Sequence, residues 1–272
     1  MNKPEVYFKS RACSTQTDYS RHIMEDYFPF IRQNSNNVKS VLDIGCGPGN
    51  TTLNVILPYL EQDTVEIIGI DKSPSMIDYA KKTYEDARVA FKEVNVVEVA
   101  PRDFIERFDY IFSFWTFHWI LDQRKLYSNV LKMLKPNGSF LVSYIANTKL
   151  YGIIQEVSQK EKYSSFVSNL SIFPFNMFIN PQQELFSILQ DAEFENIFCK
   201  VETLQFTDYT TKDLENLFLS VSPYYDCIPI NMQKEFIQDH IDLVDTVNNP
   251  NYERKYLVDY DMVIAHCRKK GN

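Results

Sequence analysis

The sequence predicts an α/β fold, a seven-stranded and mostly parallel sheet with helices on both faces. Three observations lead to this fold class. Of the 272 residues, 44% are apolar and 24% are charged, which is typical of a globular protein with a substantial core. In the first half of the chain, short β-branched runs alternate with segments of helical periodicity, as in strands joined by crossover helices. In the second half, two late strand-like runs lack such a crossover, which predicts an antiparallel pair.

The first half contains five expected strands, each a short run rich in Val, Ile, Leu or Phe. Apolar spacing and capping residues mark the helices between them. Ser73 followed by Pro74, for example, is typical of an N-cap with proline at the first helical position. The expected strands cover residues 40–44, 65–70, 89–96, 108–114 and 139–145, and the expected helices cover residues 51–60, 74–80 and 123–134.

The second half predicts a helix over residues 180–192 and strands over residues 194–206 and 256–268. Because no linker or shift in composition divides the chain, we expect residues 1–272 to form one domain. Three segments are not required by the sheet, and we interpret them as a helical lid over its open edge. An alternative stays open, since the Phe and Tyr residues of the later segments could equally be ordinary core. The three segments are residues 1–31, 151–179 and 211–247.

The net charge, the N-terminal sequence and the cysteine pattern limit the binding partners and the cell compartment that we expect. With 28 Lys and Arg against 36 Asp and Glu, the net charge is −8, which disfavours nucleic acid and anionic membrane surfaces. The N-terminus lacks the apolar core of a secretory signal, and no apolar run is long enough to span a membrane, so we expect a cytoplasmic protein without stable membrane insertion. The five cysteines are scattered without a CxxC pair, and no His or Cys pair has metal-ligand spacing, so we expect reduced thiols and no metal.

A cluster of glycines follows the first expected strand. Only seven glycines occur in 272 residues, against a background of roughly 7%, yet Gly45, Gly47 and Gly49 fall together in VLDIGCGPGNTT. Such a cluster indicates unusual backbone dihedrals or close approach of a ligand. The dinucleotide fingerprint would need its third glycine at position 50, where Asn50 stands, and no Gly-Lys-Ser/Thr of a P-loop follows. The loop therefore indicates a nucleoside ligand that is neither a dinucleotide nor the nucleoside triphosphate of a P-loop.

Acidic residues at strand ends support a nucleoside without a phosphate. Asp71 ends the second expected strand, where a carboxylate can accept hydrogen bonds from both ribose hydroxyls. Ligands of parallel sheets bind outside the carboxyl ends of the strands. We therefore expect Asp43, Asp71, Asn95 with Val96, and Ser113 to face one cleft.

The order of motifs resembles the seven-stranded methyltransferases that use S-adenosylmethionine. The motifs are VLDIGCGPG, IIGIDKSPSMIDYA, VNVVE, FDYIFSFWTFHWI and LKPNGSFLVS, within residues 38–145. The resemblance implies a Rossmann-like methyltransferase fold, with residues 38–148 as the cofactor-binding half and S-adenosylmethionine as the cofactor. It implies cofactor contacts by Asp43, Gly45, Cys46, Gly47, Asp71, Lys72, Met76, Asn95, Val96 and Ser113. Asn95 departs from the family, which usually has Asp there, so we expect a weakened adenine contact.

Three further segments resemble the insect juvenile hormone acid methyltransferases: VYFKSRACSTQ, FSFWTFHWILDQ and EKYSSFV. This resemblance implies that Gln16 and Trp119 hold the carboxylate of the substrate. A carboxylate is already ionised at pH 7, so neutral donors such as an amide NH₂ and an indole N–H suit it. Other roles stay open, because Gln16 could be an exposed amide and Trp119 a core aromatic residue. His118 could be either a structural histidine or a general base for a hydroxyl acceptor.

The leading hypothesis is a carboxyl O-methyltransferase that acts on a lipophilic isoprenoid acid of the juvenile hormone acid or farnesoic acid type. A second hypothesis keeps the cofactor but changes the acceptor to another small acid, a hydroxyl or an amine. A third is a non-catalytic carrier of a small ligand, to which Asn95 alone points. A homodimer is a further possibility that the sequence leaves open.

Overall fold

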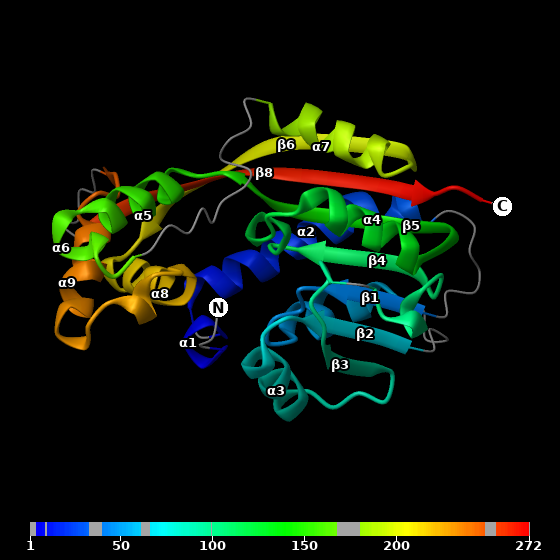
Figure 1. Ribbon diagram of the computed structural model, residues 1–272, viewed down its shortest axis with the longest axis horizontal. Helices are drawn as coiled ribbons and strands as arrows, with labels where there is room; N and C mark the ends of the chain where they lie inside the picture. Colours follow the sequence, from blue (N-terminus) through cyan, green and yellow to red (C-terminus); the bar gives the residue numbers. More distant parts are fainter. Residues whose placement is uncertain are drawn as a thin grey trace.

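The computed structural model describes residues 4–8, 10–32, 40–60, 66–98, 100–167, 180–247 and 254–271. In this part of the chain the strands form one sheet of order β3-β2-β1-β4-β5-β8-β6, and β7 pairs with β8. The first five strands of this order are parallel, whereas β8 runs antiparallel to both β5 and β6 (Figure 1). The strands are β1 (Ser40–Ile44), β2 (Glu66–Asp71), β3 (Val89–Glu93), β4 (Phe108–Phe114), β5 (Leu134–Asn147), β6 (Phe194–Tyr209), β7 (Thr246–Val247) and β8 (Lys255–Lys269).

This sheet confirms the predicted α/β fold class and the antiparallel pair at its end, with one difference in strand number. The sheet has eight strands rather than the expected seven. The additional strand is β7, which has two residues and pairs with β8. Two residues are too few to show the alternation by which a strand is recognised in a sequence. Strand ends also differ, since β5 begins at Leu134 rather than at residue 139 and β3 ends at Glu93 rather than at residue 96.

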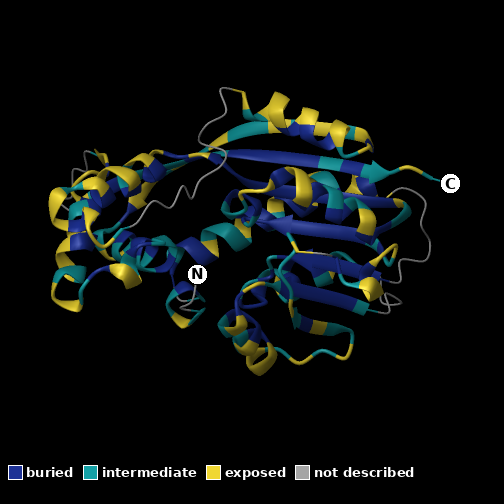
Figure 2. Ribbon diagram, viewed as in Figure 1, coloured by how far each residue is buried: buried dark blue, intermediate teal, exposed yellow. Residues whose placement is uncertain are grey.

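Helices cover both faces of the sheet, as predicted. On one face, α2 (Arg11–Ile31) packs Ile23 and Met24 against strand residues such as Val41. On the other face, α4 (Gln123–Met133) and α7 (Pro181–Asp191) pack against the opposite set, which includes Leu42. Neighbouring strand residues point to opposite faces, so Val41 and Leu42 belong to different apolar layers. Figure 2 shows the central strands buried between these layers.

The helix expected over residues 51–60 is wrong in type. The segment forms a π-helical turn, Thr52–Ile56, followed by a 3₁₀ turn, Leu57–Tyr59. Pro58 explains the change, because it has no N–H to donate and its ring would clash with a carbonyl of the preceding α-helical turn. The N–H of Leu57 bonds instead to the carbonyl of Thr52, which widens the turn. This places Thr52 beside the end of β1, where its hydroxyl contacts Asp43.

A group of helices lies at one end of the sheet, beyond the end toward which the β4 arrow points (Figure 1). Within this group α8 contacts α1, α2 and α9, and α5 contacts α6 and α9. The segment expected as helical over residues 211–247 is thus two helices, α8 and α9, with a 3₁₀ turn at Tyr225–Cys227 between them. Residues 168–179 of the expected lid lie outside the described part of the chain. The remaining helices of the described ranges are α1 (Pro4–Phe8), α3 (Pro74–Thr83), α5 (Lys149–Gln159), α6 (Glu161–Ser164), α8 (Thr211–Val221) and α9 (Ile230–Ile241).

None of the helices that the structure describes is long and apolar enough to cross a membrane.

Candidate functional site

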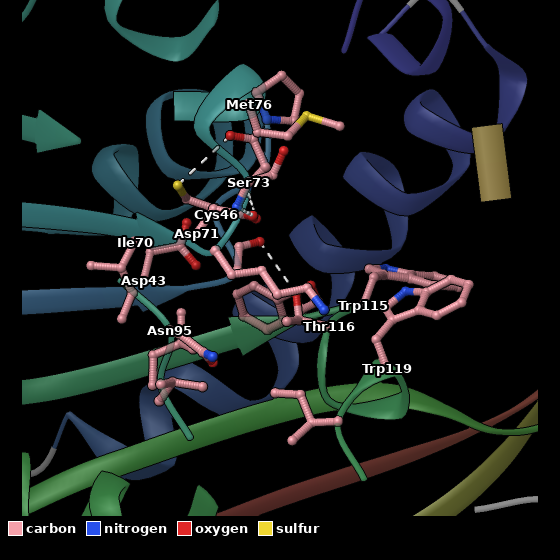
Figure 3. Close-up of a pocket in the computed structure, with 18 of the residues that line it drawn as sticks. Asp43, Cys46, Ile70, Asp71, Ser73, Met76, Asn95, Trp115, Thr116 and Trp119 are labelled. Carbon is pink, nitrogen blue, oxygen red and sulfur yellow. Dashed lines mark hydrogen bonds between the residues drawn. The ribbon is translucent and has the colours of Figure 1, made fainter. Parts of the chain in front are cut away.

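A cavity of about 670 Å³ lies outside the carboxyl ends of β1, β2 and β4. Its walls come from the loops after the first four strands, from α1 and α2, and from residues 220–223 at the end of α8. Figure 3 shows part of this lining, including Asp43, Asp71, Asn95 and Trp119. This is the position at which parallel α/β sheets bind their ligands.

The glycine loop after β1 forms one wall of the cavity. Gly45 and Gly47 have φ values of +77° and +53°, a region that L side chains rarely adopt. A Cβ on Gly45 would lie 2.1 Å from the hydroxyl oxygen of Thr116, whereas a Cβ on Gly47 would meet nothing within 4 Å. The loop is held on the sheet by the N–H groups of Gly45 and Cys46, which donate to the carbonyl of Ile70 at 2.7 and 3.0 Å. The Gly47 backbone is therefore open to a ligand, while Gly45 allows the close approach of Thr116.

Two carboxylates lie at the base of this wall. Asp43 is buried and accepts a 2.6 Å hydrogen bond from the Thr52 hydroxyl, and its burial raises its pKa to about 7. Asp71 accepts from the N–H groups of Ser73 and Gly47 at 2.8 and 3.1 Å, and burial raises its pKa as well. The charge of Asp71 also raises the pKa of Asp43. A ligand that carries positive charge would offset both the cost of burying these negative charges and their mutual repulsion.

The loop after β3 forms the next part of the wall and carries Asn95 and Val96. Asn95 Oδ1 accepts from the N–H of Val97 at 3.4 Å, and its Nδ2 donates to Glu98 Oε1 at 3.1 Å. Asn129 of α4 donates to the carbonyls of Val96 and Glu98 at 2.8 and 2.6 Å, which fixes the loop against that helix.

The structure brings nearly all of the expected site residues into this cavity. Ser113 is the exception, because it is fully buried and its hydroxyl donates to the carbonyl of Ile44 at 2.8 Å, so the expected cofactor contact of its side chain is not supported. The thiol of Cys46 points toward the carbonyl of Gly47 at 3.7 Å, and burial keeps its pKa well above the ordinary value. The expected residues that line the cavity are Gln16, Asp43, Gly45, Cys46, Gly47, Asp71, Lys72, Met76, Asn95, Val96 and Trp119.

Gln16 reaches the cavity from α2, and Tyr7 of α1 orients it. The hydroxyl of Tyr7 donates to Gln16 Oε1, and both side chains line the cavity. With the amide oxygen engaged, the amide NH₂ is the end of Gln16 that can donate to a ligand. No described residue accepts from that NH₂.

Trp119 and His118 lie on the 3₁₀ turn Phe117–Trp119 after β4, but only Trp119 lines the cavity. His118 is 3% exposed, and burial lowers its pKa to about 3. Its ring packs against Trp119 at a centroid distance of 5.0 Å. His118 is therefore a neutral residue behind the wall and a weak base, which favours the structural role that the sequence left open.

Several lining residues are not among the site residues expected from the sequence. Trp115 could have been found by the rule that singled out Asp71, because it directly follows a strand end. Asn50 was noted only for breaking a glycine pattern, although it lines the cavity. Tyr7 and residues 220–223 reach the cavity through tertiary packing, for which the sequence has no local signal. In the described ranges, no group of three or more His, Cys, Asp or Glu side chains is placed to hold a metal ion.

A comparison with protein families matches residues 35–205 to a model described as a methyltransferase domain. The chain belongs to the methyltransferase domain family. This result confirms the predicted family and S-adenosylmethionine as the cofactor. The cavity of this methyltransferase suits that cofactor, because the backbone of Gly47 is open to a ligand and because a cationic ligand would stabilise the charged forms of two carboxyl groups, the buried Asp43 and the partly buried Asp71.

Similar proteins cover nearly the whole methyltransferase. The chain is 25% identical to the juvenile hormone acid O-methyltransferase of Drosophila melanogaster over 99% of this chain and 93% of that protein. It is 24% identical to the juvenile hormone acid O-methyltransferase of Bombyx mori, over 99% and 98% of the two chains. The crystal structure of the YcgJ protein from Bacillus subtilis has the same fold, with a TM-score of 0.58 at 17% identity over 92% of this chain and 99% of that one.

Proposed function

We propose that this methyltransferase transfers a methyl group to the carboxylate of a lipophilic isoprenoid acid and so forms a methyl ester. Acids of the juvenile hormone acid or farnesoic acid type are the expected substrates. The full-length similarity to two insect juvenile hormone acid O-methyltransferases supports this substrate class.

The observation that supports the proposal is the chemistry of the side chains that line the cavity. Gln16 and Trp119 line the cavity with an amide and an indole, both neutral hydrogen-bond donors. His118, which could serve as a base for a hydroxyl acceptor, is buried behind the wall with its pKa lowered to about 3. The described lining residues include neutral donors but no histidine, which suits an acceptor that is already ionised.

Methyl transfer is an in-line displacement, in which the protein aligns the two reactants and excludes water. When bound, S-adenosylmethionine supplies an electrophilic methyl group on a sulfonium. Gln16, with its amide oxygen held by Tyr7, is oriented to donate to the carboxylate. A neutral donor positions the anion without a salt bridge that would reduce the nucleophilicity of the attacking oxygen. Lys72, the cation among the described lining residues, follows Asp71 at the end of β2 rather than lying on α2 or the Trp119 turn.

We further propose that residues 38–148 hold the cofactor and that the helical segments cover the substrate. Tyr7 and residues 220–223 line the cavity and come from two of the three expected lid segments. The described part of the third segment, residues 151–167, does not line it.

The test compares Gln16→Ala and Trp119→Phe with His118→Asn on farnesoic acid. Removing one donor from an anionic centre typically costs roughly 2–4 kcal/mol of transition-state stabilisation, so kcat/KM should fall by about two orders of magnitude for each donor variant. His118→Asn should keep the pH profile of kcat/KM. If the His118 variant loses activity while the donor variants keep near-normal rates, an acceptor that needs a base replaces the carboxylate. If the chain retains the acid but never methylates it, the protein is a carrier.

A further inference from the structure

Trp115 is a second indole in the cavity wall, four positions before Trp119. The chain contains only two tryptophans, and both line this cavity. In Figure 3 the two indoles lie on the same side of the cavity, across from the Asp43 and Asp71 carboxylates.

The backbone of Trp115 is in a conformation that a bulky residue rarely adopts. Its φ is +56°, which in most proteins is left to Gly, Asn or Asp. Its N–H donates to the carbonyl of Ser143 at 2.8 Å, so the strained turn is held by the sheet. Such strain persists where the surrounding structure imposes it, and it concentrates at functional sites. Glycine would adopt this backbone conformation without strain. The presence of tryptophan instead suggests that its side chain contributes to the cavity.

The indole ring of Trp115 is fixed on two sides. Tyr19 of α2 and Tyr260 of β8 meet it edge to face, with centroid distances of 5.6 and 5.7 Å and interplanar angles of 75° and 89°. Aromatic pairs in this arrangement are favourable and directional. The position of the indole N–H is therefore set before a ligand binds.

The indole Nε1 of Trp115 is buried, and no described residue accepts a hydrogen bond from it. The residue as a whole is 6% exposed. An indole N–H can only donate, and a buried donor without an acceptor is unfavourable. The N–H is covered in the ligand-free structure, but the ring lines the cavity, so a ligand that enters there and displaces the atoms covering the N–H can supply the acceptor.

We infer that Trp115 Nε1 donates a hydrogen bond to the carboxylate of the substrate, beside Gln16 and Trp119, and thereby favours the acid over its methyl ester. This inference rests on the proposed function. A hydrogen bond to an anionic oxygen is roughly twice as strong as one to a neutral oxygen. Methyl transfer neutralises the carboxylate, so the same N–H binds the substrate firmly and the product weakly. Trp115 is thus a specificity-determining residue that also promotes product release.

The direct test observes the indole proton of Trp115 by ¹H–¹⁵N NMR. Two tryptophans give two indole signals, and Trp119→Phe identifies the signal of Trp115. S-adenosylhomocysteine is added first, then farnesoic acid, and in a parallel sample methyl farnesoate. We expect a downfield shift of the Trp115 indole proton with the acid, a smaller shift with the ester, and little change with S-adenosylhomocysteine alone. An unmoved signal with bound acid overturns the inference, and so does a full shift with S-adenosylhomocysteine alone.

Trp115→Phe supplies the functional test, because it keeps an aromatic ring on the same backbone and removes the N–H. The preference for acid over ester, measured as the ratio of the two Kd values, should fall about tenfold, and KM for the acid should rise by a similar factor. Tyr19→Phe is the matched control, since it keeps the edge contact and removes only the hydroxyl bonded to Glu202. An unchanged Kd ratio in a folded Trp115→Phe protein overturns the inference while ester formation by the native protein continues. If the native protein forms no ester, the proposed function fails and this inference fails with it.

Discussion

Asn50 Nδ2 donates a 2.7 Å hydrogen bond to Thr17 Oγ1, which ties the glycine loop to α2 one residue beyond Gln16. Thr17 Oγ1 in turn donates to the carbonyl of Cys13 at 2.8 Å. Asn50 is 6% exposed, so the bond is shielded from water. The residue that breaks the dinucleotide glycine pattern therefore joins the glycine loop, where we expect the cofactor, to the helix that carries the proposed carboxylate donor.

Thr17→Val should weaken this connection. The change keeps the shape of the side chain but leaves the buried Asn50 amide without its acceptor, a loss of about 1–3 kcal/mol in the free energy of unfolding. KM for the acid should rise more than Kd for the cofactor, because Gln16 loses its support. Urea unfolding and steady-state kinetics measure the two effects. Ser14→Ala on the exposed face of α2 is the control, and equal stability of the two variants would contradict this role of Thr17.

Asp43 should make cofactor affinity depend on pH. Its pKa rises from the ordinary 3.8 to about 7, mainly because it is buried. Its carboxyl is protonated below that value in the free protein and becomes the anion that attracts a cationic ligand above it. Affinity for S-adenosylmethionine should therefore rise between pH 6 and 8, with proton release on binding. Calorimetry in buffers of different ionisation enthalpy measures both. A pH-independent affinity would argue against a role of Asp43 in binding the cofactor.

The same carboxyl should destabilise the free protein at higher pH. An unfolded chain loses this proton near pH 4, whereas the folded chain keeps it until about pH 7. The folded state then binds more protons over this interval, so the free energy of unfolding falls as the pH rises. Asp43→Asn should remove the effect and stabilise the free protein at pH 8 by up to about 4 kcal/mol. Urea unfolding at pH 5 and pH 8 compares the two proteins, and a matching pH dependence would refute the assignment.

Asp71→Ala should lower cofactor affinity by about tenfold to a hundredfold. The carboxylate is oriented by the N–H groups of Ser73 and Gly47, and it borders the cavity where ribose hydroxyls are expected. Leaving the ribose donors unpaired should cost about 1–3 kcal/mol in total. Calorimetry with S-adenosylmethionine measures the loss. Asp78→Ala, at an exposed position of α3, should bind as the native protein does. Native affinity in Asp71→Ala would rule out the ribose contact.

Asn95→Asp introduces the acid that the resemblance to other methyltransferases implies at this position, but Glu98 limits its effect. Asn95 Nδ2 donates to Glu98 Oε1 at 3.1 Å, so a carboxylate at position 95 would face a second carboxylate. The single change should alter Kd little, whereas Asn95→Asp combined with Glu98→Gln should tighten cofactor binding by up to about 1–2 kcal/mol. Glu98→Gln alone is the control. If the double variant binds no better than this control, Asn95 makes no contact with the adenine.

Much of the proposed cofactor side of the cavity was predictable, because its residues lie at strand ends. The rule that parallel strands present their carboxyl ends to one crevice located Asp43, Asp71 and Asn95. Ser113 obeys the same rule by position, yet its side chain turns to the carbonyl of Ile44. Which way a strand residue points depends on sheet register, and the sequence does not state it.

The acceptor side was less predictable, because it is assembled from distant segments. Tyr7 orients Gln16 through a bond between two helices, and Trp115 depends on a backbone with positive φ. Pro58 did mark the position where the α-helix gives way to a π-helical turn, and the reason could have been read from the missing N–H.

The identity of the methylated product tests the central claim most directly. The purified protein is incubated with S-adenosylmethionine that carries a deuterated methyl group and with a mixture of lipophilic acids, alcohols and amines, and the products are identified by mass spectrometry. The proposed function predicts the label in methyl esters of isoprenoid acids such as farnesoic acid, and in compounds that alkali hydrolyses. Label on a hydroxyl or an amine, or no transfer of label to any of these compounds, would contradict it.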